Sequence, residues 1–188
     1  VVSFVYLIVC FFTYKDFGIT SDEQLEYGAG EALVYYFQNG VNPSDSGLRE
    51  DHLPTNTIYY RIYQASLFLL NPTNFYEHYH LLNMVFSLSI FICFFSLAVF
   101  RYKSIKYGLL ALPFLILNPR FIGDIPTNVK DIPFAIFYFW SLFCIYLLPQ
   151  TKINKVVQVL ILGVLFALTS ATRIIGANIF LVYFIYNL

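Results

Sequence analysis

Charged residues are scarce in this 188-residue chain, since Asp, Glu, Lys and Arg together make up only 12% of it. Soluble globular domains contain about 25% charged residues and about 45–50% apolar ones. Here 59% of the residues are hydrophobic, and aromatic side chains alone reach 20%. This composition excludes a soluble domain, a disordered chain, a coiled coil and a collagen-like chain. It is typical of an integral membrane protein.

Net charge is absent, because eleven basic residues balance eleven acidic ones. A balanced chain gives no electrostatic reason to expect a nucleic-acid partner, and we predict none. Cysteine is also rare, and Cys10, Cys93 and Cys144 lie in separate apolar runs without a nearby His. That pattern excludes a zinc site or a disulfide framework. We therefore expect no metal ligands and see no evident cofactor, while a requirement for a divalent cation stays open.

Long stretches without charge predict an all-α, polytopic membrane helical bundle of about six spans. Crossing a bilayer takes about 20 residues, and several runs are shorter unless flanking Tyr, Asn and Lys extend them. The runs are apolar on all sides, unlike the alternating strands of a membrane β-barrel. The predicted spans are about 1–13, 81–100, 107–118, 132–148, 156–171 and 174–186. The short first run and the apolar end lead us to expect that residues 1–188 are the N-terminal part of a larger membrane domain, inactive by itself.

The charges between these runs predict an orientation. Two connections contain five basic residues and no acid: Arg101, Lys103, Lys106, Lys152 and Lys155. Such loops belong in the cytoplasm by the positive-inside rule. Simple alternation of spans then puts all eleven acids and all three histidines on the opposite face. We therefore expect any active site on the extracytoplasmic face of a plasma, inner or endoplasmic-reticulum membrane.

The predicted outer loop, 14–79, contains signals for surface helices. Ser21 and Gln24 have the spacing of a capping box, and apolar residues follow at helical spacing as far as Asn39-Gly40. A second aromatic helix is predicted over 57–70. We expect the first of these helices to be amphipathic and to lie on the membrane surface.

Asp22 and Glu23 stand at the start of the first surface helix. A carboxylate just outside the bilayer can act as a general base toward a hydroxyl acceptor. The alternative is that both acids only stabilise the helix start, where the macrodipole favours negative charge.

The densest polar segment between two predicted spans is 118–133. It holds two cations and two acids that could bind a phosphate and orient a carboxylate: Arg120, Asp124, Lys130 and Asp131, with Asn128 among them. The alternative is a solvated loop in which Lys130 and Asp131 pair locally.

Arg173 lies in an otherwise apolar turn between two predicted spans. Arg is costly near hydrocarbon, so it usually faces a cavity and pairs with an anion, although it can also extend to the headgroups. His52, His78 and His80 could bind a ligand or carry a proton, and we include His52 among the candidate donor contacts. No carboxylate spacing marks a metal site around them, so ordinary loop or interface histidines are the alternative.

Taken in order, the Asp-Glu pair at a surface helix, the Pro-Arg-Phe…Asn-x-Lys-Asp-Ile-Pro-Phe loop and the Thr-Arg-Ile-Ile-Gly turn resemble a known family. They are similar to the polyprenyl-phosphate-dependent membrane glycosyltransferases of the C-type fold. The likeness is greatest to the clan of dolichyl-phosphate-mannose protein mannosyltransferases and aminoarabinose transferases, as in glycosyltransferase family 39. It covers nearly the whole chain, as the N-terminal part of such an enzyme.

The resemblance implies that the protein moves a sugar from a polyprenyl-phosphate donor to a lipid, glycan or protein acceptor. It implies that Asp22 is the general base with Glu23 beside it, and that Lys130 and Asp131 are further site residues. Arg173 would then be the cation on the phosphate side. The alternatives are a transporter or channel, whose ionisable groups lie within spans, and a purely structural membrane subunit.

Overall fold

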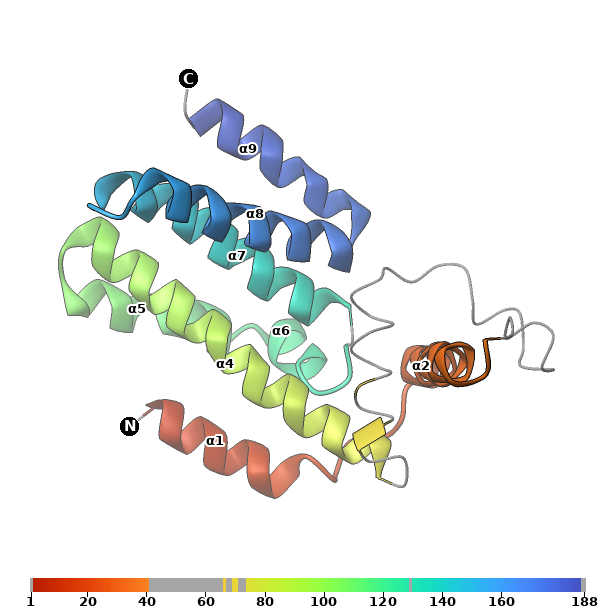
Figure 1. Ribbon diagram of the computed structural model, residues 1–188. Coiled ribbons are helices and arrows are strands. Elements are labelled where there is room, and N and C mark those ends of the chain that lie inside the picture. Colours follow the sequence, from red (N-terminus) through yellow and green to blue (C-terminus); the bar gives the residue numbers. More distant parts are fainter. Residues whose placement is uncertain (1, 41–65, 67–68, 71–73, 129, 187–188) are drawn as a thin grey trace. The chain divides into compact units, whose positions relative to one another are not determined.

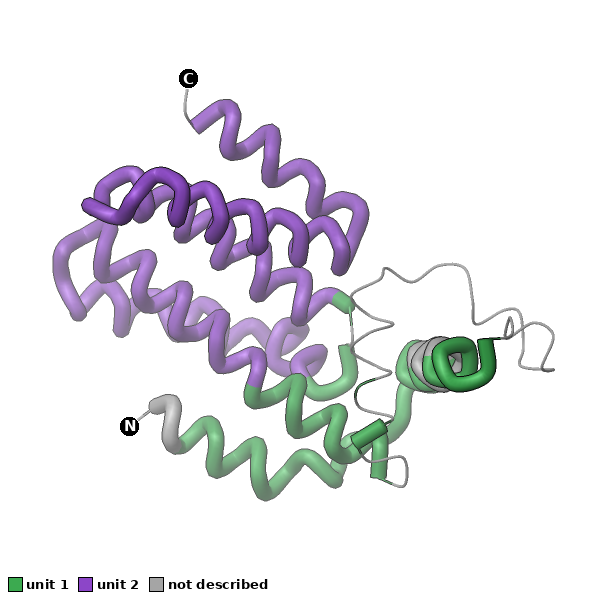
Figure 2. The backbone as a smooth tube through the Cα atoms, in the orientation of Figure 1, with its two compact units in different colours: residues 1–85, 126–130 green, residues 86–125, 131–188 purple. Residues whose placement is uncertain are grey.

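The computed structural model describes residues 2–40, 66, 69–70, 74–128 and 130–186. Within these ranges the chain is helical or forms short connections, and no strand occurs. The predicted all-helical fold class is confirmed. The chain forms two compact units, which Figure 2 colours separately. Unit 1 comprises Val1–Val85 and Pro126–Lys130, and unit 2 comprises Phe86–Ile125 and Asp131–Leu188.

Unit 1 contains α1 (Val2–Thr13), α2 (Ser21–Asn39) and the first part of α4 (Phe75–Tyr102), all labelled in Figure 1. A hydrogen bond joins α1 to α4, because the Tyr6 hydroxyl donates to the carbonyl of Met84 at 3.1 Å. Cys10 of α1 is completely buried, so it is a small residue of the apolar core.

The start of α2 differs by one residue from the prediction. Thr20, in an extended conformation, accepts a hydrogen bond at its hydroxyl from the Glu23 amide at 3.3 Å. The Glu23 carboxylate in turn accepts the Thr20 amide at 2.7 Å. The capping box is therefore Thr20 with Glu23, and the predicted pair Ser21 with Gln24 is wrong. Glu at the third helical position closes the capping box, because its side chain reaches back to the amide of the cap residue.

The end of α2 lies where the sequence predicts it. Gly40 has a φ of 66° and its amide donates to the carbonyl of Tyr36 at 2.9 Å. This left-handed conformation is accessible to Gly at little cost, and it closes the last turn. The second predicted surface helix, 57–70, lies almost entirely outside the described residues.

Each of the six predicted apolar ranges falls on a helix, and among the described residues three helices are long and apolar enough to cross a membrane. They are Phe75–Tyr102, Asp131–Gln150 and Lys155–Thr172. Two further apolar helical segments, Ile105–Ile116 and Ile174–Tyr186, are shorter. The structure thus supports a membrane protein, and the expectation of about six spans is not confirmed.

Unit 2 continues α4 and adds a series of apolar helices. These are α5 (Ile105–Ile116), α6 (Pro119–Asp124), α7 (Asp131–Leu147) with the 3-10 turn η3 (Leu148–Gln150), α8 (Lys155–Thr172), the 3-10 turn η4 (Ile174–Ala177) and α9 (Asn178–Tyr186). The helices α7 and α8 form an antiparallel hairpin whose apolar side chains, together with α9, make a buried cluster. Its members are Ile145, Leu148, Leu162, Phe166 and Ile179.

Within unit 2, α4 and α7 run in the same direction. The rings of Phe86 and Phe137 have centroids 5.6 Å apart. Farther along both helices, near the C-terminal end of α4, the centroids of Phe100 and Phe143 are 5.9 Å apart. Between these pairs, the Trp140 indole donates to the Ser89 hydroxyl at 2.6 Å. Because the two helices are parallel, the segment that contains α5 and α6 returns along them, as Figure 1 shows.

This arrangement separates the charges of unit 2 by position. The five cations of the acid-free connections lie in the last turn of α4 or follow the C-terminal ends of α4 and α7, and Figure 1 shows these ends on the left of the view. The opposite end of the hairpin holds Asp131, the first residue of α7, and Arg173, which follows α8. Unit 2 therefore has a basic end and an end with paired charges.

Candidate functional site

A buried Glu–His pair joins α2 to α4 in unit 1. Glu23 Oε1 lies 2.6 Å from His80 Nε2, and the two side chains are only 1% and 2% exposed. Glu23 Oε2 accepts hydrogen bonds from the Thr20 amide at 2.7 Å and from the Thr20 hydroxyl at 2.9 Å. Both carboxylate oxygens of Glu23 are thus used inside unit 1.

The number of protons in this pair can be derived from the contact of the second imidazole nitrogen, His80 Nδ1. His80 Nδ1 lies 3.3 Å from the carbonyl oxygen of Tyr14, and since a carbonyl only accepts, Nδ1 carries a hydrogen. One further proton then lies between His80 and Glu23, either on the imidazole or on the carboxyl group. The pair is neutral as a whole in both cases, which explains how it tolerates burial.

Asp22, the neighbouring acid, has the opposite environment. It lies in the first turn of α2, is exposed, and forms no hydrogen bond or ion pair with the described residues. The Thr20–Glu23–His80 contacts anchor this turn, so they hold the backbone of Asp22 while leaving its carboxylate accessible. Of the two predicted acids, Glu23 is buried in a contact between helices and Asp22 is exposed.

His80 is the residue that sequence reasoning missed, because it was interpreted as an ordinary interface histidine. It is 57 positions from Glu23 in the chain, so no local spacing indicates the pair. His78 has a local contact within the helix start, with Nδ1 at 2.9 Å from the Asn74 carbonyl oxygen. His52 lies outside the described residues.

Polar contacts also involve Asn128 and Lys130, which belong to unit 1. Asn83 of α4 is fully buried and its Nδ2 donates to the Asn128 carbonyl and to the Tyr79 hydroxyl, both at 3.3 Å. The Asn128 side chain accepts the Lys130 amide at 3.2 Å. Asn128 therefore orders the backbone before α7, and this accounts for its position without a substrate contact.

Asp131 and Arg173 form an ion pair across the α7–α8 hairpin in unit 2, with Arg173 Nη2 at 2.5 Å from Asp131 Oδ1. Asp131 stands at the N-terminus of α7 and Arg173 at the C-terminus of α8, and each helix dipole favours the charge that it meets. The side chains are 52% and 42% exposed, so the pair remains accessible. The structure thus brings together two of the predicted site residues.

Hydrogen-bonding capacity is left over beside this pair. Arg173 Nε and the hydroxyl of Ser170, one turn earlier in α8, are buried and have no hydrogen-bond partner among the described residues. Such groups are rare in folded proteins and usually meet a ligand or water. The Arg173 guanidinium thus has donor capacity beyond the Nη2 atom that contacts Asp131.

Arg120 and Asp124 are placed differently. On α6, Arg120 Nε lies 3.9 Å from Asp124 Oδ2, and the Arg120 side chain is 91% exposed. An exposed pair one helical turn apart contributes at most about 0.5 kcal/mol. Asn118 is the N-cap of this helix, and its side chain accepts a hydrogen bond from the Phe121 amide at 3.1 Å. In the structure these two residues form a local surface pair.

One further pair lies on the surface of unit 1. Lys15 Nζ is 3.5 Å from Glu77 Oε2. The pKa of Lys15 is raised above its ordinary value by Tyr14 first and by Glu77 second. A raised pKa means that the pairing is present at neutral pH and is lost only as the pH rises through that pKa.

Metal binding has no support in the described ranges, where no group of three or more His, Cys, Asp or Glu side chains is arranged to hold an ion. Comparisons with protein-family models, with curated proteins and with solved structures gave no match to this chain. The resemblance to polyprenyl-phosphate glycosyltransferases therefore stays a prediction.

Proposed function

We propose that the protein is a membrane glycosyltransferase that takes a sugar from a polyprenyl-phosphate donor on the extracytoplasmic face. The observation that carries this proposal is the accessible Asp131–Arg173 ion pair at the end of unit 2 opposite the basic loops. A donor with an isoprenoid tail would lie along the exposed apolar helices and present its phosphate at their end.

Arg173 is suited to hold a phosphate. A guanidinium group offers several donors in a fixed plane, and its hydrogen bonds to phosphate are charge-assisted. Asp131 fixes the plane of the group by contacting Nη2, and the 42% exposed side chain keeps further N–H donors for a second anion. As the glycosidic bond breaks, negative charge grows on the leaving phosphate, and a preorganised cation stabilises that charge.

The acceptor hydroxyl must lose a proton, and we assign this step to Asp22. In the proposed reaction the carboxylate takes the proton while the acceptor oxygen attacks the anomeric carbon. The bond between that carbon and the phosphate oxygen breaks, and its electron pair stays on the phosphate. This single displacement inverts the anomeric configuration. It needs neither a covalent enzyme intermediate nor a cofactor.

The distribution of charge also supports a surface site over a transport path, which is the alternative from another class. Transporters place ionisable groups near the middle of their spans. Here 81–100, 132–150 and 156–171 contain no Asp, Glu, Lys, Arg or His. The charged groups stand at the helix ends instead.

The proposal is tested with the full-length protein in proteoliposomes and a panel of radiolabelled polyprenyl-phosphate sugars. Donor binding and the release of polyprenyl phosphate are measured for the wild type and for Arg173→Ala. We expect Arg173→Ala to weaken donor binding about tenfold or more, since one charge-assisted hydrogen bond contributes about 1.5–3 kcal/mol.

Lys152→Ala is the matched control, because it removes a cation from the other end of unit 2. It should leave binding and turnover unchanged. If the wild type binds none of the donors, or if the two variants behave alike, the proposed function is wrong.

A further inference from the structure

We propose that the basic end of unit 2 binds an anionic phospholipid of the surrounding leaflet, with the phosphate at Arg101 and an acyl chain in the adjacent cavity. This site is separate from Arg173 and does not depend on the proposed transferase activity.

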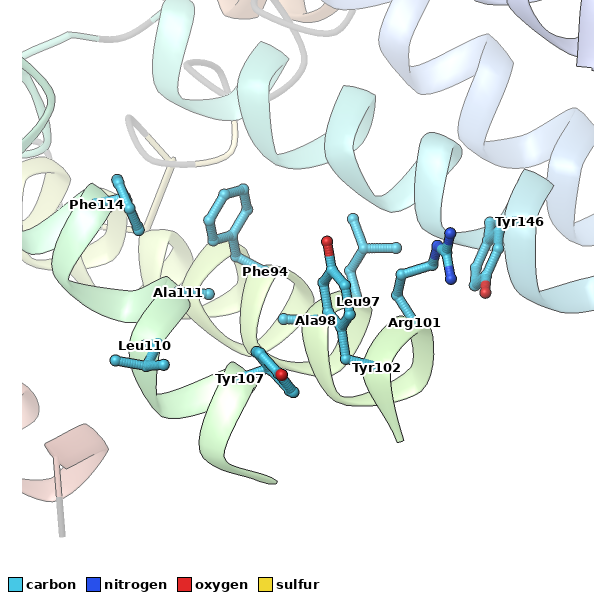
Figure 3. Close-up of a pocket in the computed structure, with 10 residues that line it drawn as sticks. All are labelled: Phe94, Leu97, Ala98, Arg101, Tyr102, Tyr107, Leu110, Ala111, Phe114 and Tyr146. Carbon is cyan, nitrogen blue, oxygen red and sulfur yellow. The ribbon is translucent and has the colours of Figure 1, made fainter. Parts of the chain in front are cut away.

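The cavity lies between α4, α5 and α7 and has a volume of about 660 Å³. That volume is in the range of known sites for small molecules, about 300–1,000 Å³. Figure 3 shows Phe114 at one end of the cavity and Arg101 with Tyr146 at the other. Most of its wall is apolar, formed by Phe94, Leu97, Ala98, Leu110, Ala111 and Phe114.

The polar end contains one cation and three tyrosines. Arg101 lies beside Tyr102, with 5.6 Å from the guanidinium carbon to the ring centroid, and Tyr107 and Tyr146 complete this end. In the described part of the chain Arg101 has no carboxylate partner. A guanidinium and phenol hydroxyls are donors suited to phosphate oxygens.

The surrounding charge favours an anion. Lys103 and Lys106 follow Arg101 in the corner between α4 and α5, and Lys152 and Lys155 follow α7. Neither 78–123 nor 132–188 contains a single Asp or Glu. Basic residues that cluster at the ends of membrane helices without acids attract anionic headgroups.

The apolar wall decides between a lipid and a soluble anion. A small hydrated anion gains nothing from six apolar side chains next to the guanidinium, whereas an acyl chain buries apolar surface against them. The wall also opens outward, since Leu110 and Phe114 are 63% and 79% exposed. A phospholipid can thus enter sideways from the bilayer.

The test is native mass spectrometry of the purified full chain with defined lipids. Dioleoyl-phosphatidylglycerol and dioleoyl-phosphatidylcholine are titrated onto wild type, Arg101→Gln and Ala111→Trp, each first shown to keep the elution volume and helical content of the wild type. We expect wild type to bind phosphatidylglycerol at least tenfold more tightly than phosphatidylcholine. Arg101→Gln should lose this preference, and Ala111→Trp, which fills the cavity, should bind both lipids less.

Lys152→Gln is the matched control, because it removes a charge from the same end of unit 2 without lining the cavity. It should retain the preference. If Lys152→Gln and Arg101→Gln lose the preference for phosphatidylglycerol equally, the lipid responds to diffuse surface charge and the proposed site is wrong. A wild type that binds both lipids equally would also overturn it. Displacement of phosphatidylglycerol by equimolar undecaprenyl phosphate would overturn it in favour of a polyprenyl occupant. Arg101→Lys should keep the preference in part.

Discussion

Glu23 and His80, 57 positions apart in the chain, share a 2.6 Å hydrogen bond that water scarcely reaches. The contact closes unit 1 by fixing the first turn of α2 on the side of α4. It also determines which of two adjacent acids is available, because Glu23 is used up by the fold and Asp22 is not.

The first prediction concerns the stability of this contact. Glu23→Gln should lower the free energy of unfolding by about 3–5 kcal/mol, because it leaves His80 buried without its acidic partner. Glu77→Gln removes the partner of Lys15 on the surface and should cost less than about 1 kcal/mol. Unfolding in mild detergent, followed by circular dichroism, measures both. Similar midpoints for the two variants would exclude a stabilising role for the buried pair.

The second prediction concerns Asp22. Asp22→Asn should keep donor binding and lower the single-turnover rate of sugar transfer by about 10²–10⁴-fold, because the amide cannot accept the acceptor's proton. Asp16→Asn, the same change at another exposed acid of unit 1, should leave the rate unaltered. An unchanged rate in Asp22→Asn would leave Asp22 as an acid that only stabilises the helix start.

The third prediction concerns the close approach of η4 to α8. A Cβ on Gly176 would lie 2.7 Å from the carbonyl carbon of Thr169, and backbone atoms cannot move aside cheaply. Gly176→Ala should therefore destabilise the protein by about 1–3 kcal/mol. Gly163→Ala, at a position inside α8 with open space around it, should stabilise the protein by about 0.5–1 kcal/mol. The thermal midpoint of Gly176→Ala should therefore lie below that of Gly163→Ala. The reverse order would contradict the close packing of η4 on α8.

The fourth prediction concerns the orientation in the membrane. Cysteines introduced at Lys106 and Lys152 should react with a membrane-impermeant maleimide only from the cytoplasmic side, and one at Arg120 only from the other. The native cysteines are buried or half-buried, so their background should be low. Labelling of Arg120→Cys from the cytoplasm would remove the sidedness on which the proposed function depends.

Local patterns predicted the helices well, because each apolar run and each Gly or Asn stop acts within a few residues. The cap of α2 was misplaced by one position, since Thr20 and Ser21 are both good caps and only the reach of the Glu23 carboxylate selects Thr20. The number of spans could not be derived from apolar length, because α5 and η4 with α9 are helical but short.

The candidate site was predictable only in part. Arg173 attracts attention by standing alone in an apolar turn, and hairpin geometry brings Asp131 to the same end. His80 and the cavity at Arg101 depend on contacts between residues distant in the chain. No spacing rule reaches across 57 positions, or across the three helices that enclose the cavity.

Trp140 is the only tryptophan in the chain, and its indole nitrogen bonds to Ser89 on the neighbouring α4. Its emission spectrum therefore comes from the α4–α7 contact alone. A red shift on adding lipid, donor or denaturant would mean that water has reached that contact. The protein thus contains an intrinsic optical reporter of whether its parallel helices stay together, without any added label.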